Sequence, residues 1–337
     1  EKIMAVKKIG INGFGRIGRY LVRLLADSND LEVAVINARA DNAGLAHLLK
    51  YDSTHGHFPY PVEACEEGII VNGKTIKVTR DPLGEWKWGE LGIDLVIETT
   101  GKMKDKTAAM DHIKCGAKKV IVSAPTKEAD ATIVMGVNDS DYDVAAHQVI
   151  SAASCTTNCL APATKVIDEN FGIVKGLMTT IHSYTMSQRI LDGSHKDLRR
   201  ARSCAVSMIP TSTGAARAIG LVYPKLKGKI DGMAIRVPTP NVSIVDFTVT
   251  LEKPATVEEI NAALKKASQG AMKDNLGYTE EPLVSIDFNG DTHGGVVDAE
   301  LTSVIEGNMA KVIIWYDNEA SFTNQLVRLT KMVAKSM

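Results

Sequence analysis

The sequence predicts an α/β protein of two domains: a doubly wound parallel sheet, and then a second, α+β domain with a largely antiparallel sheet. Through the first half of the chain, short apolar strand-like runs alternate with helix-like segments, which is the pattern of a parallel sheet covered by helices. After Ser151, long β-rich stretches follow one another with one helix among them, which favours an α+β domain. The length of 337 residues fits two domains of ordinary size.

The elements of the first half follow in order from apolar spacing and turn residues. A strand at residues 6–11 leads through a glycine-rich turn into a helix at residues 19–26, where leucine and valine recur at helical spacing. The remaining elements are a strand at 31–36, a helix at 43–50, a hairpin within 69–79 that turns at Asn72-Gly73, a strand at 94–98, a helix at 107–115 and a strand at 119–122.

The second half begins with a helix that follows Cys155 and reaches residue 170. Its β-rich stretches cover residues 173–182, 230–238, 242–251 and 310–316, with a helix at 257–269 between them and a final helix at 321–335. We place the first domain at residues 1–154 plus 319–337 and the second at residues 155–318. We expect the two domains to pack tightly, with the active site between them.

Composition excludes several classes of function. The net charge is −1 and the basic residues are spread along the chain, apart from Arg199-Arg200-Arg202, so no basic field calls for a nucleic-acid partner. No apolar run approaches the ~20 residues of a membrane span, and no signal-peptide pattern opens the chain. The five cysteines have neither disulfide nor metal-site spacing. We therefore expect a cytoplasmic protein with reduced thiols and no metal, whose native start is Met4.

A glycine-rich turn marks a dinucleotide-binding domain of the Rossmann type. The run Gly13-Phe14-Gly15-Arg16-Ile17-Gly18 follows a predicted strand, opens a predicted helix and is followed by another strand. The glycines allow a tight turn and a close approach of the backbone to a pyrophosphate, which faces the helix N-terminus. The alternative is a glycine-rich turn without a ligand, which the strand–turn–helix context disfavours.

The residues after the second strand bear on the choice of dinucleotide. An acidic residue is expected there to hold the adenosine ribose hydroxyls, but the chain reads Asn37-Ala38-Arg39. Ala38 removes the repulsion that a carboxylate would exert on a 2′-phosphate, and Arg39 is placed to pair with that phosphate. The sequence thus predicts that NADP is accepted or preferred. The alternative is that Arg39 points to solvent and that NAD binds through other contacts.

The run Ser154-Cys155-Thr156-Thr157-Asn158 places a thiol just ahead of a predicted helix. Unpaired backbone N–H groups and the positive end of the helix dipole favour the thiolate there, and the thiolate is the nucleophile. A reactive thiol beside a hydride acceptor suggests aldehyde oxidation through a thioester. His182, at the end of a predicted strand, is the candidate partner: as an imidazolium it would lower the thiol pKa and then act as acid and base. Taken alone, a histidine at a strand end is more often structural.

Eight motifs follow one another along the chain: INGFGRIGR (residues 11–19), KYDSTHG (50–56), SCTTNC (154–159), HSYT (182–185), DLRRAR (197–202), STGAA (212–216), RVPTPNV (236–242) and WYDNE (315–319). With them the chain resembles phosphorylating glyceraldehyde-3-phosphate dehydrogenases along essentially its whole length. The resemblance implies a glycolytic or gluconeogenic enzyme that converts D-glyceraldehyde 3-phosphate, NAD(P) and inorganic phosphate to 1,3-bisphosphoglycerate. It implies Cys155 as the nucleophile and His182 as the group that takes the hydroxyl proton; the Cys155 N–H and the His182 ring would bind the oxyanion.

The resemblance also assigns residues to the bound molecules. The positions that contact phosphate-sized anions are Ser154, Thr156, Thr185, Arg199, Thr213, Gly214 and Arg236. The alternative for the serines and threonines is turn capping. The positions that contact the dinucleotide are Gly13, Gly15, Arg16, Ile17, Arg80, Thr100, Ser123 and Asn318. Among these, Asn318 is expected to bond the nicotinamide amide.

The chain departs from the family pattern in ways that favour NADP. Ala38 replaces the aspartate of NAD-specific members, and Gly193-Ser194 stands in the loop 186–202 where NAD-specific bacterial members often have Leu-Pro. In the family this loop comes from a neighbouring subunit of a homotetramer, from which Ser194 would reach the 2′-phosphate. Met186-Ser187 and Ala320-Ser321-Phe322 also differ from common family residues and bear on the substrate phosphate site and on cofactor affinity.

Two other functions remain as alternatives. Erythrose-4-phosphate dehydrogenases resemble the chain at the glycine turn and the thiol motif but diverge at the segments that here occupy residues 182–185 and 212–215. A non-catalytic dinucleotide-binding scaffold, redox-sensing or RNA-binding, would reuse the same fold. A non-catalytic scaffold is expected to have lost catalytic residues, whereas Cys155 and His182 both stand in intact motifs.

Overall fold

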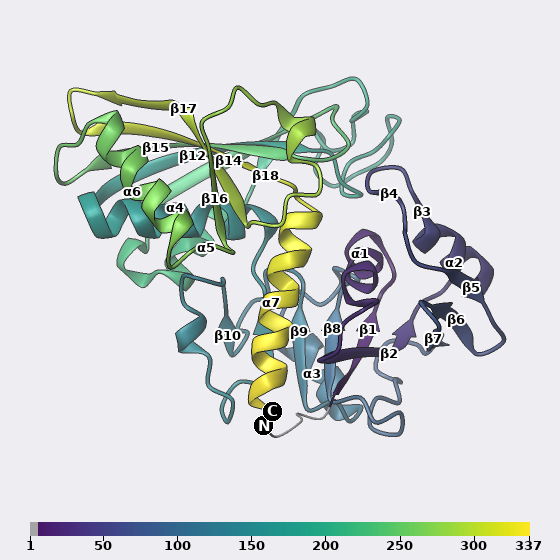
Figure 1. Cartoon of the computed structure of the whole chain (residues 1–337). Helices are drawn as coiled ribbons and strands as arrows, with labels where there is room; N and C mark the ends of the chain where they lie inside the picture. The colour runs from purple at the N-terminus through teal and green to yellow at the C-terminus, as the bar shows by residue number, and fades with distance from the viewer. Residues whose placement is uncertain (1–5) are drawn as a thin grey trace. The chain divides into compact units, whose positions relative to one another are not determined.

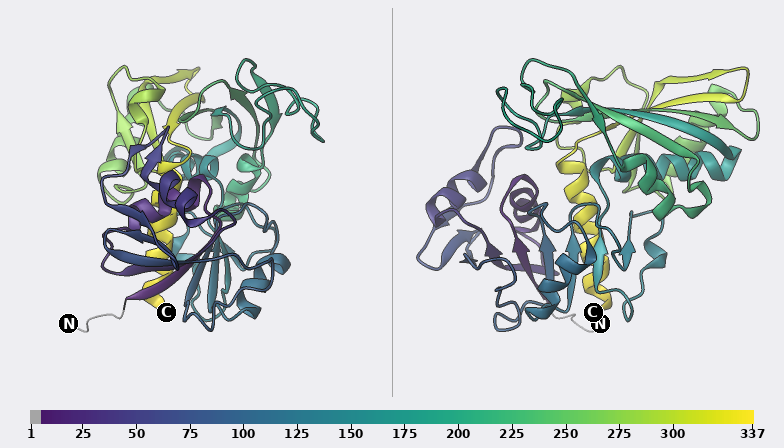
Figure 2. Two further views of the ribbon diagram at one scale, coloured as in Figure 1. Left: turned by 90° about the vertical axis from the view of Figure 1, so that its right-hand side faces the viewer. Right: turned by 180° about the vertical axis from the view of Figure 1, so that it is seen from behind.

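The computed structural model describes residues 6–337, whose contacts form two compact units (Figure 1, Figure 2). The first unit holds the described residues up to Ile133 together with Asp139–Ala153 and Leu326–Met337, and the second holds Val134–Asn138 and Ser154–Gln325. The predicted domain limits stay a prediction, and this division assigns residues 134–138, 154 and 319–325 differently from them. The expected start at Met4 lies outside the described residues.

The first unit is built on one sheet of mainly parallel strands, which in the described chain run in the order β10-β11-β9-β8-β1-β2-β7-β6-β5. The strands are β1 (Lys7–Asn12), β2 (Leu31–Asn37), β5 (Val62–Ala64), β6 (Gly68–Val71), β7 (Lys74–Thr79), β8 (Leu95–Glu98), β9 (Lys119–Val122), β10 (Ala131–Thr132) and β11 (Val149–Ser151). β1 pairs with β2 on one side and with β8 on the other. The strand order therefore reverses at β1, and ligands of such sheets bind at the carboxyl ends beside this point.

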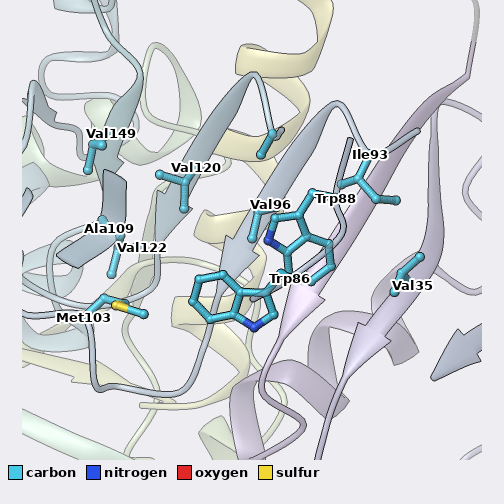
Figure 3. Packing of buried hydrophobic residues seen from close by; sticks show 11 residues of the cluster. Val35, Trp86, Trp88, Ile93, Val96, Met103, Ala109, Val120, Val122 and Val149 are labelled. Carbon is cyan, nitrogen blue, oxygen red and sulfur yellow. The ribbon is translucent and has the colours of Figure 1, made fainter. Parts of the chain in front are cut away.

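Helices and a buried aromatic pair complete the first unit. The helices are α1 (Arg16–Leu25), α2 (Asn42–Lys50) and α3 (Lys106–Lys114), and a small hairpin is formed by β3 (Tyr51–Asp52) and β4 (Gly56–His57). Asp41 and Asp105 cap α2 and α3 by accepting backbone N–H groups of the first turn. Trp86 and Trp88 pack with the valines of β8 and β9 in one buried cluster (Figure 3).

The second unit is built on a largely antiparallel sheet with the strand order β13-β14-β12-β15-β18-β17-β16 among its described residues. The strands are β12 (Ile173–Ser183), β13 (Ile209–Ser212), β14 (Ile230–Val237), β15 (Ser243–Leu251), β16 (Leu276–Thr279), β17 (Gly295–Ile305) and β18 (Met309–Tyr316). The helices α4 (Cys155–Phe171), α5 (Ala215–Val222) and α6 (Val257–Gln269) contact this sheet on one face (Figure 1). The last helix, α7 (Ala320–Ser336), begins in this unit and ends in the first.

The predicted fold class is confirmed, with one parallel and one largely antiparallel sheet. The helix predicted at 257–269 has the bounds of α6. The sequence did not reveal β16 and β17, although β17 has 11 residues. The reason is that residues 295–299 are buried in succession and include Asp298, so the strand shows no alternation of polar and apolar residues.

Three observations on the described residues bear on partners. Among residues 6–337, no helix combines the length and the apolar character that crossing a membrane requires. Across the same residues, no group of three or more His, Cys, Asp and Glu side chains is arranged to hold a metal ion. Each of the five cysteines is a free thiol.

Candidate active site

The thiol predicted as the nucleophile begins a long helix in the second unit. Cys155 is the first residue of α4, and the Ser154 hydroxyl accepts a hydrogen bond from the Thr157 N–H at 3.1 Å. Serine is a preferred N-cap because its oxygen satisfies one of the unpaired N–H groups of the first turn. The sequence thereby places the thiol at the positive end of the helix dipole.

His182 reaches the thiol from the end of β12. Its Nε2 lies 3.5 Å from the Sγ of Cys155, and its side chain is buried, with 4% exposed. The Tyr316 ring stands edge-on to the imidazole, with centroids 5.8 Å apart. The Tyr316 hydroxyl is held by bonds of 2.9 Å to Thr156 and 2.8 Å to Thr180. The structure thus brings the two predicted catalytic side chains together and fixes the plane of the ring.

The other imidazole nitrogen, Nδ1, has two competing partners. The Nη1 of Arg236 lies 2.6 Å from it, and the backbone oxygen of Ser183 lies 2.7 Å from it. A guanidinium only donates, so its contact requires a lone pair on Nδ1 and places the ring proton on Nε2, toward the thiol. A bond to Ser183 requires the proton on Nδ1 instead. The position of Arg236 therefore decides whether Nε2 meets the sulfur as a donor or as an acceptor.

Burial and the charge of Arg236 keep the imidazole neutral. Burial, and then the guanidinium, lower the pKa of His182 to about 3, while the bond to the Ser183 backbone acts in the opposite direction. Burial raises the pKa of Cys155, whereas Arg236 and hydrogen bonds from Thr156 lower it. These shifts favour a neutral ring over the expected imidazolium in this geometry. The positive charge that lowers the pKa of the thiol is the Arg236 guanidinium.

Several residues expected to hold anions lie at a loop and a helix start of the second unit. Thr185 follows β12, and its hydroxyl is 2.9 Å from that of Ser187. Gly214 is the N-cap of α5, and the Thr213 hydroxyl accepts from the Ala215 N–H at 3.2 Å. A Cβ added at Gly214 would meet no atom within 4 Å, so space is open at the start of α5.

The other members of the anion-binding set lie in three different surroundings. Ser154 and Arg236 adjoin the catalytic pair, one through the chain and one through the contact with the imidazole. The Thr156 hydroxyl is buried against Tyr316, which supports a structural role for that hydroxyl. Arg199 lies in the loop between β12 and β13 with an exposed side chain, so the structure does not bring it to the pair.

A hydrogen-bonded chain that the sequence did not reveal links the strand of His182 to Asn318. The Ser183 N–H donates to the Ser243 Oγ at 3.0 Å, and this hydroxyl donates to the Oδ1 of Asn318 at 2.9 Å. The amide oxygen is thereby engaged, which leaves the N–H groups of the Asn318 Nδ2 to donate to other acceptors. The nearest sequence signal was the motif at residues 236–242, which ends one residue before Ser243. The preceding Val242 has a φ of 65°, which is rare for a β-branched residue.

A pocket of about 650 Å³ opens in the first unit at the ends of β1 and β2. This volume lies in the usual range for sites that bind small ligands and cofactors. Of the predicted dinucleotide contacts, those that line it are Gly13, Gly15, Ala38, Arg39, Arg80 and Thr100. The structure therefore brings together residues that are up to 87 positions apart, as between Gly13 and Thr100, at one edge of the parallel sheet.

The three glycines of the turn have separate roles in this pocket. Gly13 has a φ of 99°, which glycine adopts without strain. A Cβ added at Gly18 would lie 2.4 Å from the Gly13 oxygen, so α1 passes too close to the turn for any side chain. Gly15 is the N-cap of α1, and an added Cβ there would meet no atom within 4 Å. The start of α1 is thus open to an anion of the pyrophosphate type.

Three predicted contacts of the first unit lie outside the lining of this pocket. Within the described chain, Arg16, Ile17 and Ser123 are not among the residues that line the pocket. The Arg16 side chain instead pairs with Asp52, with Nη2 and Oδ1 2.9 Å apart. Ile17 lies in the first turn of α1, and Ser123 directly follows β9. Side-chain contacts with a ligand in this pocket are therefore not indicated for these three residues.

Of the residues on which the NADP prediction rests, Arg39 and Ser194 are exposed and Ala38 is buried. Arg39 lines the pocket with an exposed side chain. Arg80 folds back on the same loop, where its Nη2 donates to the Ala40 oxygen at 2.8 Å and to the Asn42 Oδ1 at 2.7 Å. Ser194 is exposed in the second unit. The position directly after β2 thus holds Ala38 in place of an acidic residue, and the guanidinium groups of Arg39 and Arg80 line the same pocket.

Comparisons with known proteins point to one family. A family model described as "Glyceraldehyde 3-phosphate dehydrogenase, NAD binding domain" matches residues 7–106, and one described as its "C-terminal domain" matches residues 154–318. The chain is 57% identical to glyceraldehyde-3-phosphate dehydrogenase of Geobacillus stearothermophilus over 333 residues, which cover 98% of this chain and 99% of that protein. It is 56% identical to glyceraldehyde-3-phosphate dehydrogenase 1 of Bacillus cereus, covering 96% and 97% of the two chains. It is 53% identical to the Mycobacterium avium protein of the same name, covering 98% and 99%.

Proposed function

This chain belongs to the glyceraldehyde-3-phosphate dehydrogenase family, and from this premise we propose that it oxidises D-glyceraldehyde 3-phosphate, with a nicotinamide dinucleotide and inorganic phosphate, to 1,3-bisphosphoglycerate. The observation that carries the proposal is the contact of 3.5 Å between the Cys155 Sγ and the His182 Nε2 at the start of α4. The pocket beside Gly13 and Gly15 in the first unit fits the dinucleotide.

Cys155 forms the covalent bond of the proposed reaction. Its sulfur adds to the aldehyde carbon, and the proton that leaves the thiol passes through His182 to the former carbonyl oxygen, which gives a hemithioacetal. A nicotinamide dinucleotide, held in the pocket beside Gly13 and Gly15, would supply the acceptor for the hydride of this carbon. His182 takes the hydroxyl proton as the hemithioacetal becomes a thioester. An oxygen of inorganic phosphate then attacks the thioester carbon, and the sulfur leaves as thiolate, which restores Cys155.

Arg236 couples anion binding to the basicity of His182 in this proposal. A phosphate group draws the guanidinium away from Nδ1, because charge-assisted bonds to phosphate are stronger than a bond to a neutral ring. Nδ1 then carries the ring proton and donates it to the Ser183 oxygen, 2.7 Å away. The lone pair of Nε2 now faces the reacting atoms as a base. Loss of the neighbouring cation also lets the pKa of His182 rise from its depressed value.

Formation of reduced dinucleotide tests the proposed activity. D-glyceraldehyde 3-phosphate and erythrose 4-phosphate are compared, each with and without inorganic phosphate. Faster turnover of the first aldehyde, dependent on phosphate, supports the proposal. Faster turnover of erythrose 4-phosphate favours the alternative dehydrogenase. A chain that binds dinucleotide and oxidises neither aldehyde is a scaffold, a reading opposed by the contact between Cys155 and His182.

We also propose that the chain accepts or prefers NADP. The support is the methyl group of Ala38 in the pocket wall, where an acidic side chain would repel a 2′-phosphate, and the exposed guanidinium of Arg39 next to it. Ser194, contributed by a neighbouring subunit, would add a hydroxyl donor to the same phosphate.

Introducing Ala38→Asp should weaken NADP binding by ~100-fold or more and leave NAD binding equal or tighter, because like charges placed together cost several kcal/mol. The measurement is the Kd of each dinucleotide by calorimetric titration. Ala38→Asn is the matched control, since it has the size of aspartate without its charge. Equal losses of NAD and NADP affinity in Ala38→Asp would remove the selectivity argument.

We propose further that the chain forms a homotetramer. The support is the face of the second sheet opposite α4, α5 and α6 (Figure 1). There Leu177 of β12 is 67% exposed, and Met233 of β14, on the same face, is 40% exposed. Leu198, in the loop between β12 and β13, is 82% exposed. Exposed apolar side chains on a sheet face that these helices leave uncovered support an interface between subunits.

The substitution Leu177→Asp should shift the protein from a tetramer to a smaller species at micromolar concentration, because it buries a charge without a partner in the interface. Analytical ultracentrifugation checks this. Val144→Asp is the control, since Val144 is an exposed apolar residue of the first unit. An unchanged sedimentation profile for Leu177→Asp would place the interface elsewhere.

We propose finally that the protein acts in the cytoplasm, in glycolysis or, when the reaction runs in reverse, in gluconeogenesis. The family assignment supports the pathway. The five free thiols suit a reducing compartment.

A further inference from the structure

Four neighbouring strands of the first unit end in side chains that bond one another. The strands β8, β1, β2 and β7 lie side by side (Figure 1), and their register aligns Glu98, Asn12, Asn37 and Thr79 in a row. The Asn12 Nδ2 donates to the Glu98 Oε2 at 2.6 Å. The Asn37 Nδ2 donates to the Asn12 Oδ1 at 2.9 Å, and the Thr79 hydroxyl donates to the Asn37 Oδ1 at 3.0 Å. We call these four side chains the polar ladder.

A second arm reaches Glu98 from α3. The Trp88 Nε1 donates to the His112 Nδ1 at 3.0 Å, and the His112 Nε2 lies 3.1 Å from the Glu98 Oε2. An indole N–H only donates, so Nδ1 carries a lone pair and the ring proton lies on Nε2, toward Glu98. Trp86, which stands beside Trp88 in the buried cluster (Figure 3), stacks on the imidazole with centroids 4.0 Å apart. The hydrogen bonds of this arm therefore run in one direction, from the Trp88 donor through His112 to Glu98.

Both arms start from groups that only donate. The polar ladder starts at the Asp81 backbone N–H, which donates to the Asn37 Oδ1 at 2.9 Å, and the other arm starts at the Trp88 indole. Two donor chains that run toward each other have to meet on an acceptor, and a carboxylate is acceptor-only. The other oxygen of Glu98 accepts from the Thr100 N–H at 2.6 Å and from the Thr100 hydroxyl.

Glu98 is ionised although it is fully buried. Burial raises the pKa of this carboxyl, but hydrogen bonds from His112, Thr100 and Asn12 outweigh burial and hold the pKa below its ordinary value. Donors on both oxygens thus compensate for the lost hydration of the charge.

We propose that Glu98 is a positioning residue of the dinucleotide site, because its acceptor-only carboxylate is the group on which the polar ladder and the second arm both end. Asn12, Asn37 and Thr100 line the pocket, while Glu98 lies beneath them. Asn37 also directly precedes Ala38, so the ladder holds the backbone from which the adenosine ribose is recognised. This inference rests on the proposed use of a dinucleotide.

The substitution Glu98→Gln tests the inference, because it keeps the size and turns one acceptor into a donor. In one orientation the new NH₂ faces the Thr100 N–H, and in the other it faces Asn12 and His112. We expect the Kd of NAD and of NADP, measured by calorimetry on the full chain, to rise at least about ten-fold. The rate at which iodoacetamide labels Cys155 without dinucleotide should stay unchanged, whereas general unfolding would alter it.

Asp130→Asn is the matched control in the same unit. Asp130 accepts from the N–H groups of Gln148 at 3.0 Å and Val149 at 2.8 Å, and it is not among the residues that line the pocket in the described chain. At a similar loss of Tm, its dinucleotide Kd should stay within about two-fold of the parent value. A rise in Glu98→Gln no larger than that of the control overturns the inference.

A milder variant covers the case in which Glu98→Gln does not fold. Thr79→Val removes the hydroxyl at the far end of the polar ladder with little change of shape, and it should raise the dinucleotide Kd about three-fold. An unchanged Kd in Thr79→Val then overturns the inference. A parent chain that binds neither NAD nor NADP overturns the proposed function instead, so the two failures are distinguishable.

Discussion

Replacing Cys155 by serine is expected to lower kcat by on the order of 10⁴-fold or more and to leave the dinucleotide Kd unchanged. A hydroxyl at the start of α4 ionises far less readily than a thiol, and it forms an ester in place of the thioester that phosphate has to cleave. The pocket that fits the dinucleotide is lined by residues of the first unit, which the substitution does not touch. Steady-state kinetics and calorimetric titration check both parts of the expectation.

Cys159→Ala is the control for this substitution. Cys159 lies one turn further along α4, and its buried Sγ is 3.9 Å from the Ile314 oxygen, so it touches no reacting atom. Its removal should change kcat by no more than about three-fold. Near-parent turnover of Cys155→Ser would contradict the nucleophile assignment. The same is true if rapid quenching, with aldehyde and oxidised dinucleotide but without phosphate, traps no acyl group on Cys155.

His182→Asn is expected to lower kcat by about 10²- to 10⁴-fold, the range of general acid–base catalysis. The Nε2 that lies 3.5 Å from the Cys155 Sγ is lost, and with it the group that moves the hydroxyl proton. Alkylation of Cys155 by iodoacetamide should also require a higher pH, because the thiolate loses a hydrogen-bond partner. Tyr316→Phe is the control, since it keeps the ring against His182 and removes only a hydroxyl. Equal kcat values for the two variants would refute the role of His182.

His182→Asn should also change how the free energy of unfolding depends on pH. In the folded chain the pKa of His182 is about 3, whereas an unfolded histidine has a pKa of about 6.5. Between these values the unfolded chain binds a proton that the folded chain does not, so the free energy of unfolding falls as the pH drops. The slope is at most about 1.4 kcal/mol per pH unit. Denaturant titrations from pH 6.5 downward should show a shallower fall for His182→Asn, and identical slopes would contradict a buried neutral ring.

The first unit shows what local pattern and chemistry predict well. Its glycine turn was recognised from the strand before it and the helix after it, and Gly13 and Gly18 have the tight geometry that this pattern requires. The position of Cys155 as the first residue of α4 was likewise foreseen from Ser154 and the helical run behind it. Both signals are local, because capping and turn chemistry act within a few residues.

The charge state of the catalytic pair did not follow from the sequence. His182 was expected to be an imidazolium, but its pKa depends on burial and on Arg236, which is 54 residues away in sequence. The chain from Ser183 through Ser243 to Asn318 depends in the same way on strand pairing. Such properties arise from contacts between distant segments, which spacing along one chain does not contain.

The close approach of α1 to the turn before it bears on how new cofactor preferences arise. With only 2.4 Å between an added Cβ at Gly18 and the Gly13 oxygen, even one methyl group would push the helix off the strand. Directed-evolution libraries should therefore leave these glycines untouched. Diversity belongs at residues 38–40, which line an open cavity. Substitutions in this fold are thus expected in the short loop at residues 38–40. They are not expected at Gly13 and Gly18, where α1 packs against the turn.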